Sequence, residues 1–288
     1  EIDGTGTVTA TLGSITLNST NDSLTSTLGT LTAENDSISV VNGTYAVTAI
    51  NTNAGGLTIA GDSSGAFGTV GAENSGVYLT TSGNVSFTSI DSDVIVGSGT
   101  GDYALGTVTS SAQTSVQITT GSGDDSMDLD DAGAGVKYTV STGDGADTIT
   151  ATETAANTVV NTGGGNDTLV LDSTSTALGT FAMGDGTADT VDLSSADTDY
   201  SGYGVWTGVE IITLAGGGTV TLSEAQIDND ATFEVRGGNS TISVTGNTID
   251  VSEVTFLAGN TSFFSLVGAG TADTLTGSDA SDDLDGNA

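Results

Sequence analysis

The chain has no cysteine, no histidine and almost no positive charge. Its only basic residues are Lys137 and Arg236, against 37 acidic residues. Without Cys there are neither disulfides nor thiolate metal sites, and without His or Cys an active site is hard to assemble, so we expect no enzyme. The formal charge of −35 makes nucleic acid and anionic membrane surfaces poor partners.

Long apolar stretches are also missing. No run of 18 apolar residues occurs, so we expect no membrane insertion. The first residues, Glu1-Ile-Asp-Gly4, lack the basic and apolar regions of a signal peptide. Because the chain stops within a repeat at Asp285-Gly-Asn-Ala288, we expect it to be a fragment or processed form of a longer protein.

Helical patterns are scarce, and a single turn at Ser223–Ile227 is the best candidate. Val and Ile outnumber Leu, Thr is abundant, and 43 glycines supply turns, which favours strands. Leu, Ile, Val and Phe make up 65 of the 288 residues, enough to disfavour disorder. The sequence therefore predicts an all-β fold, and its self-repulsion suggests that cations stabilise it.

What the sequence does contain is a repeated glycine turn between Thr120 and Asp192. Each copy has two glycines, then an aspartate, then an apolar residue two places later. The aspartates are 22, 20 and 22 residues apart, and such a period is the signature of a solenoid. The four copies are Gly121-Ser-Gly-Asp-Asp125-Ser-Met127, Gly143-Asp-Gly-Ala-Asp147-Thr-Ile149, Gly163-Gly-Gly-Asn-Asp167-Thr-Leu169 and Gly184-Asp-Gly-Thr-Ala-Asp189-Thr-Val191.

The chemistry of these turns points to calcium. Glycines permit a sharp turn that directs carbonyl oxygens inward, and the aspartate adds a hard anionic oxygen. Calcium takes six to eight such oxygens. One turn supplies too few, but two stacked turns supply about six ligands for an ion between coils. Ordinary Asx turns in a Gly/Asp-rich β protein, or acidic salt adaptation, are the alternatives, but salt adaptation does not explain the period.

The turns resemble the RTX (repeats in toxin) pattern G-G-x-G-x-D-x-U-x. The stretch from Thr162 to Val170 fits it best, departing only at the first glycine. The resemblance implies a calcium-binding parallel β-solenoid of the β-roll or β-helix type, elongated and right-handed. RTX rolls repeat every nine residues, whereas here one turn recurs every 20 to 22, so calcium would line one edge. The metal-binding residues that it implies are Gly121, Gly123, Asp125, Gly143, Gly145, Asp147, Gly163, Gly165, Asp167, Gly184, Gly186, Asp189, Asp273 and Asp282.

Two further acidic groups are candidates. Asp102 ends Gly97-Ser-Gly-Thr-Gly-Asp102 and lies 23 residues before Asp125, so we include it as a possible first rung. The densest acidic cluster is a candidate extra metal site, although a solvated edge explains it equally well. It consists of Asp124, Asp125, Asp128, Asp130 and Asp131.

The sequence suggests four regions. We expect an irregular β-solenoid or small β domain over 1–95, calcium-binding coils over 96–193, a continuation with an aromatic core over 194–267, and tandem nonapeptides from 268 to 288. In the first region, Leu12-Gly-Ser-Ile-Thr-Leu17 returns at Leu28, but the offset of 16 fits no fixed coil length.

The composition, and the mixture of RTX-like turns with plain β blocks, resemble bacterial S-layer and related surface-array or filament proteins. The resemblance implies a secreted, calcium-dependent structural protein that assembles with itself at the cell surface. The alternative is a binding segment of a large RTX adhesin that recognises cells, glycans or ice.

Overall fold

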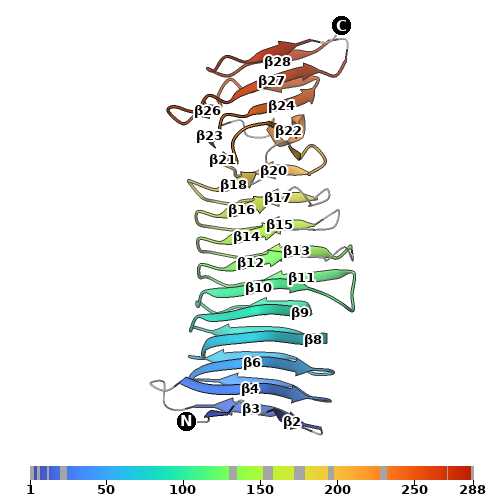
Figure 1. The fold of residues 1–288 in the computed structure, drawn as a ribbon, viewed down its shortest axis with the longest axis vertical. Coiled ribbons are helices and arrows are strands. Elements are labelled where there is room, and N and C mark those ends of the chain that lie inside the picture. The colour runs from blue at the N-terminus through green and yellow to red at the C-terminus, as the bar shows by residue number, and fades with distance from the viewer. Residues whose placement is uncertain are drawn as a thin grey trace. The chain divides into compact units, whose positions relative to one another are not determined.

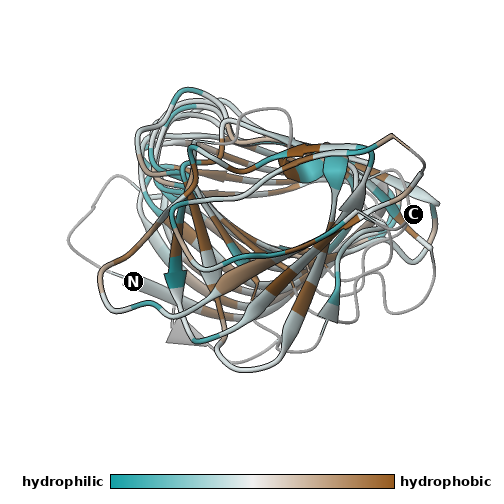
Figure 2. Ribbon diagram, turned by 90° about the horizontal axis from the view of Figure 1, so that it is seen from above, coloured by the Kyte–Doolittle hydropathy of each residue, from teal (hydrophilic) through white to brown (hydrophobic). Residues whose placement is uncertain are grey.

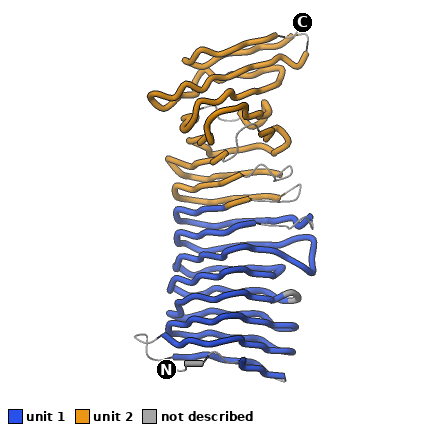
Figure 3. Tube along the Cα trace, viewed as in Figure 1, with its two compact units in different colours: residues 1–149 blue, residues 150–288 orange. Residues whose placement is uncertain are grey.

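The computed structural model divides the chain into two compact units, residues 1–149 and 150–288 (Figure 3). Strand β14 (Thr148–Ala151) crosses this boundary in the sequence. The backbone alone is described at residues 3, 4, 73 and 74. The structure describes residues 3–4, 7–11, 13–19, 25–129, 135–151, 158–171, 179–193, 198–227, 232–270 and 272–286.

Unit 1 is built from parallel strands that lie one above another (Figure 1). Its strands are β1 (Asp3–Gly4), β2 (Val8–Ala10), β3 (Ile15–Asn18), β4 (Thr25–Ala33), β5 (Ile38–Val41), β6 (Thr44–Thr52), β7 (Leu57–Gly61), β8 (Ser64–Thr81), β9 (Val85–Gly97), β10 (Tyr103–Thr109), β11 (Ser115–Thr119), β12 (Ser126–Leu129) and β13 (Lys137–Ser141).

These strands stack in two runs, one on each side of the coil. The first run contains β4, β6, the N-terminal part of β8, the N-terminal part of β9, β10 and β12. The second contains β3, β5, β7, the C-terminal parts of β8 and β9, β11 and β13. Because β8 and β9 pair in both runs, each of them bends around one coil.

Stacked aliphatic side chains form the core of unit 1. Along the second run, residues in register point inward and are at most 1% exposed: Ile38, Leu57, Val77, Ile95, Ile118 and Val140. Burying each of them contributes about 2 kcal/mol. Neighbouring positions alternate with them and face outward, so hydrophobic and hydrophilic positions alternate along the strands (Figure 2).

Unit 2 continues the same architecture. Its strands are β15 (Val159–Asn161), β16 (Thr168–Leu171), β17 (Thr180–Ala182), β18 (Thr190–Leu193), β19 (Thr198–Asp199), β20 (Val205–Thr207), β21 (Ile211–Leu214), β22 (Thr219–Ser223), β23 (Glu234–Gly237), β24 (Thr241–Gly246), β25 (Thr248–Asp250), β26 (Thr255–Phe256), β27 (Phe263–Gly268), β28 (Thr274–Thr276) and β29 (Asp283–Asp285). The parallel stacks are β16–β18–β21–β23–β26, β15–β17–β20, β19–β22–β24–β27–β29 and β25–β28.

The predicted parallel β-solenoid is confirmed in both units. The short helix expected at Ser223–Ile227 is present as α1 (Glu224–Ile227). The aromatic core expected over 194–267 includes Trp206 and Phe264, which are at most 3% exposed. Arg236 forms an ion pair with Glu234 on its own strand. In the part of the chain that the structure describes, no helix is long and apolar enough to cross a membrane.

Candidate cation site at the glycine turns

The glycine turns stack at one corner of the coil. In unit 1, one turn joins β11 to β12 and the next joins β13 to β14, and Ser122 pairs with Asp144 between them. Gly143 and Gly145 have φ angles of 100° and 143°, which L side chains rarely adopt. A Cβ on either would lie 2.0 Å from the carbonyl oxygen of Gly121 or Gly123 in the coil before. The glycines therefore allow both the turn and the close stacking of coils.

A row of buried aspartates runs up the inside of this corner in each unit, and we call it the inner row. In unit 1, Asp125 and Asp147 are 2% and 1% exposed. The amide of Asp125 donates to Asp147 Oδ1 (2.8 Å), and the amide of Tyr103 donates to Asp125 Oδ1 (2.8 Å). Each carboxylate thus accepts an N–H from the preceding coil.

Unit 2 repeats this arrangement. Asp167 and Asp189 are fully buried, and the amide of Asp167 donates to Asp189 Oδ1 (2.8 Å). The amide of Asp189 donates to Glu210 Oε2 (2.9 Å), so a glutamate takes the next position of the row. The repeat pattern does not reveal Glu210, because this glutamate stands where the other coils have the aspartate of a glycine turn.

An outer row of polar side chains lies beside the inner row and bonds in the opposite direction. The amide of Asp124 donates to Asp102 Oδ1 (3.0 Å), and the amide of Ala146 donates to Asp124 Oδ1 (2.8 Å). In unit 2, the amide of Thr187 donates to Asn166 Oδ1 (3.1 Å). Outer side chains therefore accept an N–H from the following coil.

Asp102 belongs to the outer row and is not the counterpart of Asp125. Ala104 pairs with Ser126, which places Asp102 beside Asp124 and Tyr103 beside Asp125. The Tyr103 ring occupies the corner next to Gly97 and Gly99, and its hydroxyl donates to the carbonyl of Thr81 (2.8 Å). The sequence pattern does not distinguish the position of Asp102 from that of Asp125, because the turn of Asp102 has the same Gly-x-Gly-Thr form as the turn of Asp189.

The threonine that replaces the first glycine of the RTX pattern also faces the interior. Thr120, Thr142 and Thr162 are at most 4% exposed. The Thr120 hydroxyl donates to the carbonyl of Thr142 (2.8 Å), and the Thr162 hydroxyl donates to the carbonyl of Met183 (2.6 Å). A glycine at these positions would leave the buried space of the threonine side chain empty and would remove the hydroxyl that bonds to the carbonyl of the next coil. This explains why threonine replaces the first glycine of the RTX pattern.

The turns of Asp189 and Asp273 have one extra residue, and in each of them the aspartate accepts a backbone amide of its own turn. The amide of Gly186 donates to Asp189 Oδ2 (3.1 Å), and the amide of Gly270 donates to Asp273 Oδ1 (3.2 Å). Asp282 accepts the amide of Phe264 from the preceding coil (3.0 Å), like an inner-row residue. Asp273 precedes β28, which pairs with β25, whereas Asp282 precedes β29, which pairs with β27. The two aspartates of the nonapeptide tandem therefore belong to different sheets.

Burial makes two of the inner carboxylates, Asp125 and Asp189, hard to ionise. It raises the pKa of Asp125 to about 6, with Asp147 and Asp102 adding repulsion while the hydrogen bond from the Tyr103 amide opposes the shift. Burial likewise raises the pKa of Asp189 to about 6, with repulsion from Glu210 and Asp167. Asp125 Oδ2 is withdrawn from solvent and has no hydrogen-bond partner, which leaves a charged oxygen for a proton or a cation to neutralise.

These residues fit calcium in part. The donors at the corner are hard carboxylate and carbonyl oxygens, which calcium prefers. Among the described residues, however, no group of three or more acidic side chains converges to hold a metal. Any ion here would need backbone carbonyls as most of its ligands. Asp130 and Asp131 of the acidic cluster predicted as an extra metal site lie outside the described residues.

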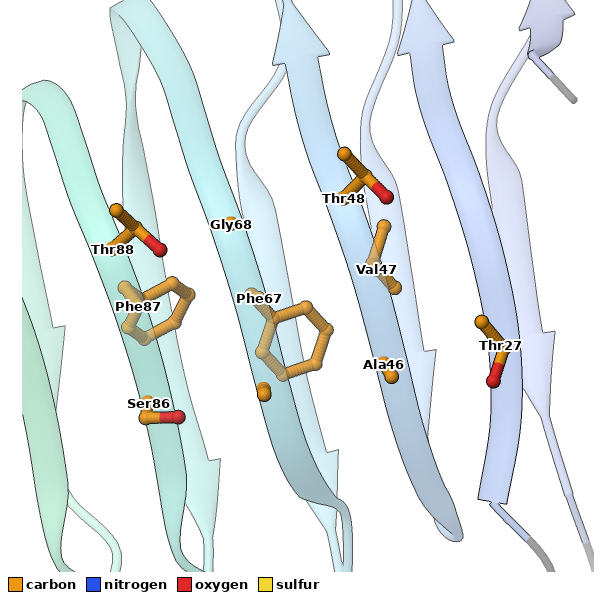
Figure 4. A pocket seen from close by; sticks show the side chains of 10 residues that line it. Thr27, Ala46, Val47, Thr48, Phe67, Gly68, Ser86, Phe87 and Thr88 are labelled. Carbon is orange, nitrogen blue, oxygen red and sulfur yellow. The ribbon is translucent and has the colours of Figure 1, made fainter. Parts of the chain in front are cut away.

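A pocket of about 310 Å³ lies along β4, β6, β8 and β9 in unit 1 (Figure 4). Small and hydroxyl side chains such as Thr27, Ala46 and Ser86 line it, together with Phe67 and Phe87, whose rings stack 5.5 Å apart. None of its lining residues is acidic or basic, so it offers no acid–base pair.

Comparison with known proteins gives no family model, no curated protein and no solved structure that matches this chain. The resemblance to RTX repeats therefore rests on the residues of the turns alone.

Proposed function

We propose that this chain is a calcium-dependent structural protein that works outside the cell and assembles with copies of itself into a surface layer or filament. The observation that supports this best is the second carboxylate oxygen of Asp125. It is buried, it lacks a hydrogen-bond partner, and it belongs to a row of acidic side chains inside a chain of charge −35. A cation at this corner removes the cost of burying such an anion.

Asp125, Asp147, Asp167 and Asp189 are the side chains that would hold the ion, together with carbonyls of the glycine turns. Bound calcium would supply positive charge between neighbouring carboxylates. The chain's own residues fix the carboxylates of Asp125, Asp147 and Asp189, because each of the three accepts an amide N–H from the coil before it. Since the ion binds only the stacked form, calcium binding adds directly to the free energy of folding.

Folding that depends on calcium is useful for a protein that is exported from the cell. Calcium is scarce inside cells and abundant outside, so the chain would stay loosely folded until secretion and then form its coils. Bound ions would also reduce repulsion between acidic copies, which favours assembly at the surface.

A calcium titration of the chelator-treated chain tests the proposal, with circular dichroism for strand content and negative-stain microscopy for assembly. We expect strand content to rise and sheets or fibres to appear with calcium, but not with the same concentration of magnesium, which demands stricter octahedral geometry. Asp125→Asn with Asp147→Asn should weaken the response, whereas Asp62→Asn, at a short exposed turn, should not.

Strand content and assembly that are the same in calcium and in chelator would reject the proposal, and the inner row would then be held by protons and amides alone. A chain that folds with calcium, stays monomeric and binds cells, glycans or ice would instead favour the adhesin.

A further inference from the structure

Among the residues of unit 1 that the structure describes, one sheet face carries no acidic side chain. It is the outer side of the second strand run: β3, β5, β7, residues 76–81 of β8, residues 94–97 of β9, β11 and β13. Its strands contain Thr, Ser, Val, Asn and Gln at outward positions and a single charge, the exposed Lys137. We call it the uncharged face.

The uncharged face also exposes large apolar side chains next to each other. Tyr78 on β8 and Val96 on β9 are 42% and 36% exposed, and they are paired in register. The Tyr78 ring lies against the backbone of Gly56 and Gly76, where an added Cβ would come within 3.2 Å and 2.8 Å of ring atoms. The two glycines let the ring lie close to the sheet, which produces a small apolar patch.

Acidic side chains lie at other places in unit 1. Asp62, Asp102 and Asp124 are at the corner turns, and Asp91 and Asp128 are on strands of the first run. Two copies of a chain with charge −35 repel each other wherever acidic surfaces meet, over about 8 Å at physiological salt. The uncharged face is where two copies can approach with the least repulsion.

We propose that the uncharged face is the surface through which two copies of this chain pack sheet against sheet, with Tyr78 and Val96 at the centre of the contact. This inference rests on the proposed self-assembly and assigns it a surface. Seven strand segments spaced about 4.8 Å apart and roughly 16 Å long cover about 500 Å² per copy, or about 1,000 Å² in total. Stable dimers bury more, so each contact is weak and becomes effective only when many copies are arrayed.

The test is sedimentation velocity of the full 288-residue chain over a wide concentration range, in chelator and in calcium, at low and high NaCl. We expect the average mass to rise with concentration, and to rise further with NaCl even in chelator, because salt screens the remaining repulsion. Val96→Glu and Tyr78→Glu should weaken association at least tenfold. Thr88→Glu is the matched control, since it adds the same charge at an exposed site on β9 outside this face.

A second pair of variants tests whether a loss of association comes from the contact itself and not from misfolding of the variant. Tyr78→Glu mixed with Tyr78→Lys should associate more strongly than Tyr78→Glu alone, because opposite charges then meet across the contact. Circular dichroism must show the wild-type strand content for each variant that enters the comparison.

Three outcomes would overturn the inference: a wild-type chain that stays monomeric at every concentration and salt, equal weakening by Val96→Glu and Thr88→Glu, or no rescue in the mixture. If calcium-induced sheets or fibres form equally well with Val96→Glu, the surface is wrong while the proposed function stands. If calcium induces no assembly but the salt-dependent dimer is lost with Val96→Glu, the proposed function fails while the surface stands.

Discussion

The same corner of the coil is turned in two ways within unit 1. Between β5 and β6 the turn is Asn42-Gly43, with φ angles of 57° and 94°, and between β7 and β8 it is also only two residues long. From β11 to β12 the corresponding turn runs from Thr120 to Asp125. Both kinds of coil stack in parallel register. The longer turn is therefore not needed to reverse the chain.

The extra residues of the longer turn place a carboxylate, that of Asp125, in the interior of the coil. In the short-turn coils, neutral groups fill the corner: the hydroxyl of Ser63 donates to the carbonyl of Ala60 (2.6 Å), and the hydroxyl of Thr81 donates to the carbonyl of Ser63 (2.5 Å). In the long-turn coils, Thr120 and Asp125 are the buried polar side chains of the turn. A solenoid that stacks well with hydroxyl groups has no structural need for a buried anion, so the aspartates point to a role for cations or protons.

Gly143→Ala should break the long-turn coils most severely. The new Cβ would meet the Gly121 carbonyl at 2.0 Å, in a backbone conformation that alanine disfavours. We expect a loss of about 3 kcal/mol or more in the free energy of unfolding, measured with urea. Gly13→Ala is the control, because its φ is also positive (123°) but nothing lies within 4 Å of the added carbon. Equal losses would show that backbone strain alone explains the glycines.

Lowering the pH should stabilise the chain in the absence of calcium. A raised carboxyl pKa means that the folded state binds the proton more tightly than the unfolded state. The stabilisation from Asp125 and Asp189 is therefore complete below pH 4 and is lost as the pH rises through about 6. We expect Tm in chelator to fall by several degrees between pH 5 and pH 7. High NaCl in both samples suppresses the general repulsion, and Asp125→Asn with Asp189→Asn should flatten the profile.

Asp125→Asn should make a long-turn coil resemble a short-turn coil. The side-chain oxygen of Asn can still accept the Tyr103 amide, but the buried charge is gone. Without calcium at pH 7, we expect a gain of about 1 kcal/mol after allowance for solvent screening. In calcium this gain should disappear or reverse, because a ligand is lost. A variant that is less stable than wild type in chelator would contradict this account of the inner row.

Thr120→Val should have the smallest effect. It keeps the shape of the side chain but removes the hydroxyl that donates to the carbonyl of Thr142. A loss of about 1 kcal/mol in the free energy of unfolding, measured with urea, is expected for one buried hydrogen bond. Thr119→Val, on the exposed neighbour, should change stability by less than about 0.5 kcal/mol.

The solenoid could be predicted where turn length is constant. From Asp125 to Asp189 each coil has a glycine turn of similar size, so its period appears in the sequence. In residues 1–95 the turns differ, and residues stacked in register are 23, 19 and 20 apart at Ile15, Ile38, Leu57 and Val77. The offset of 16 compared residues of β3 with residues of β4, and these strands belong to different strand runs, since β3 pairs with β5 and β4 pairs with β6.

The site could be predicted only as a set of residue types. The spacing identified the buried aspartates, but it assigned Asp102 to the wrong position, because a single register step separates an inner from an outer side chain. Tyr103 and Glu210 occupy positions at which the other coils have the inner aspartate. Because neither residue is an aspartate, the pattern does not reveal that they continue the inner row. The opposite bonding directions of the two rows depend on backbone amides, which carry no sequence signal.

Those opposite directions make the coil a unit of growth. Each long-turn coil donates a backbone amide to the inner carboxylate of the following coil. Its outer side-chain oxygen accepts a backbone amide of that same following coil. The preceding coil makes the matching outer bond from its own side. A duplicated stretch of 22 residues, such as 121–142, would meet the donors and acceptors that its template already uses. The length of such a protein can therefore change by whole coils through tandem duplication, with no compensating substitution elsewhere.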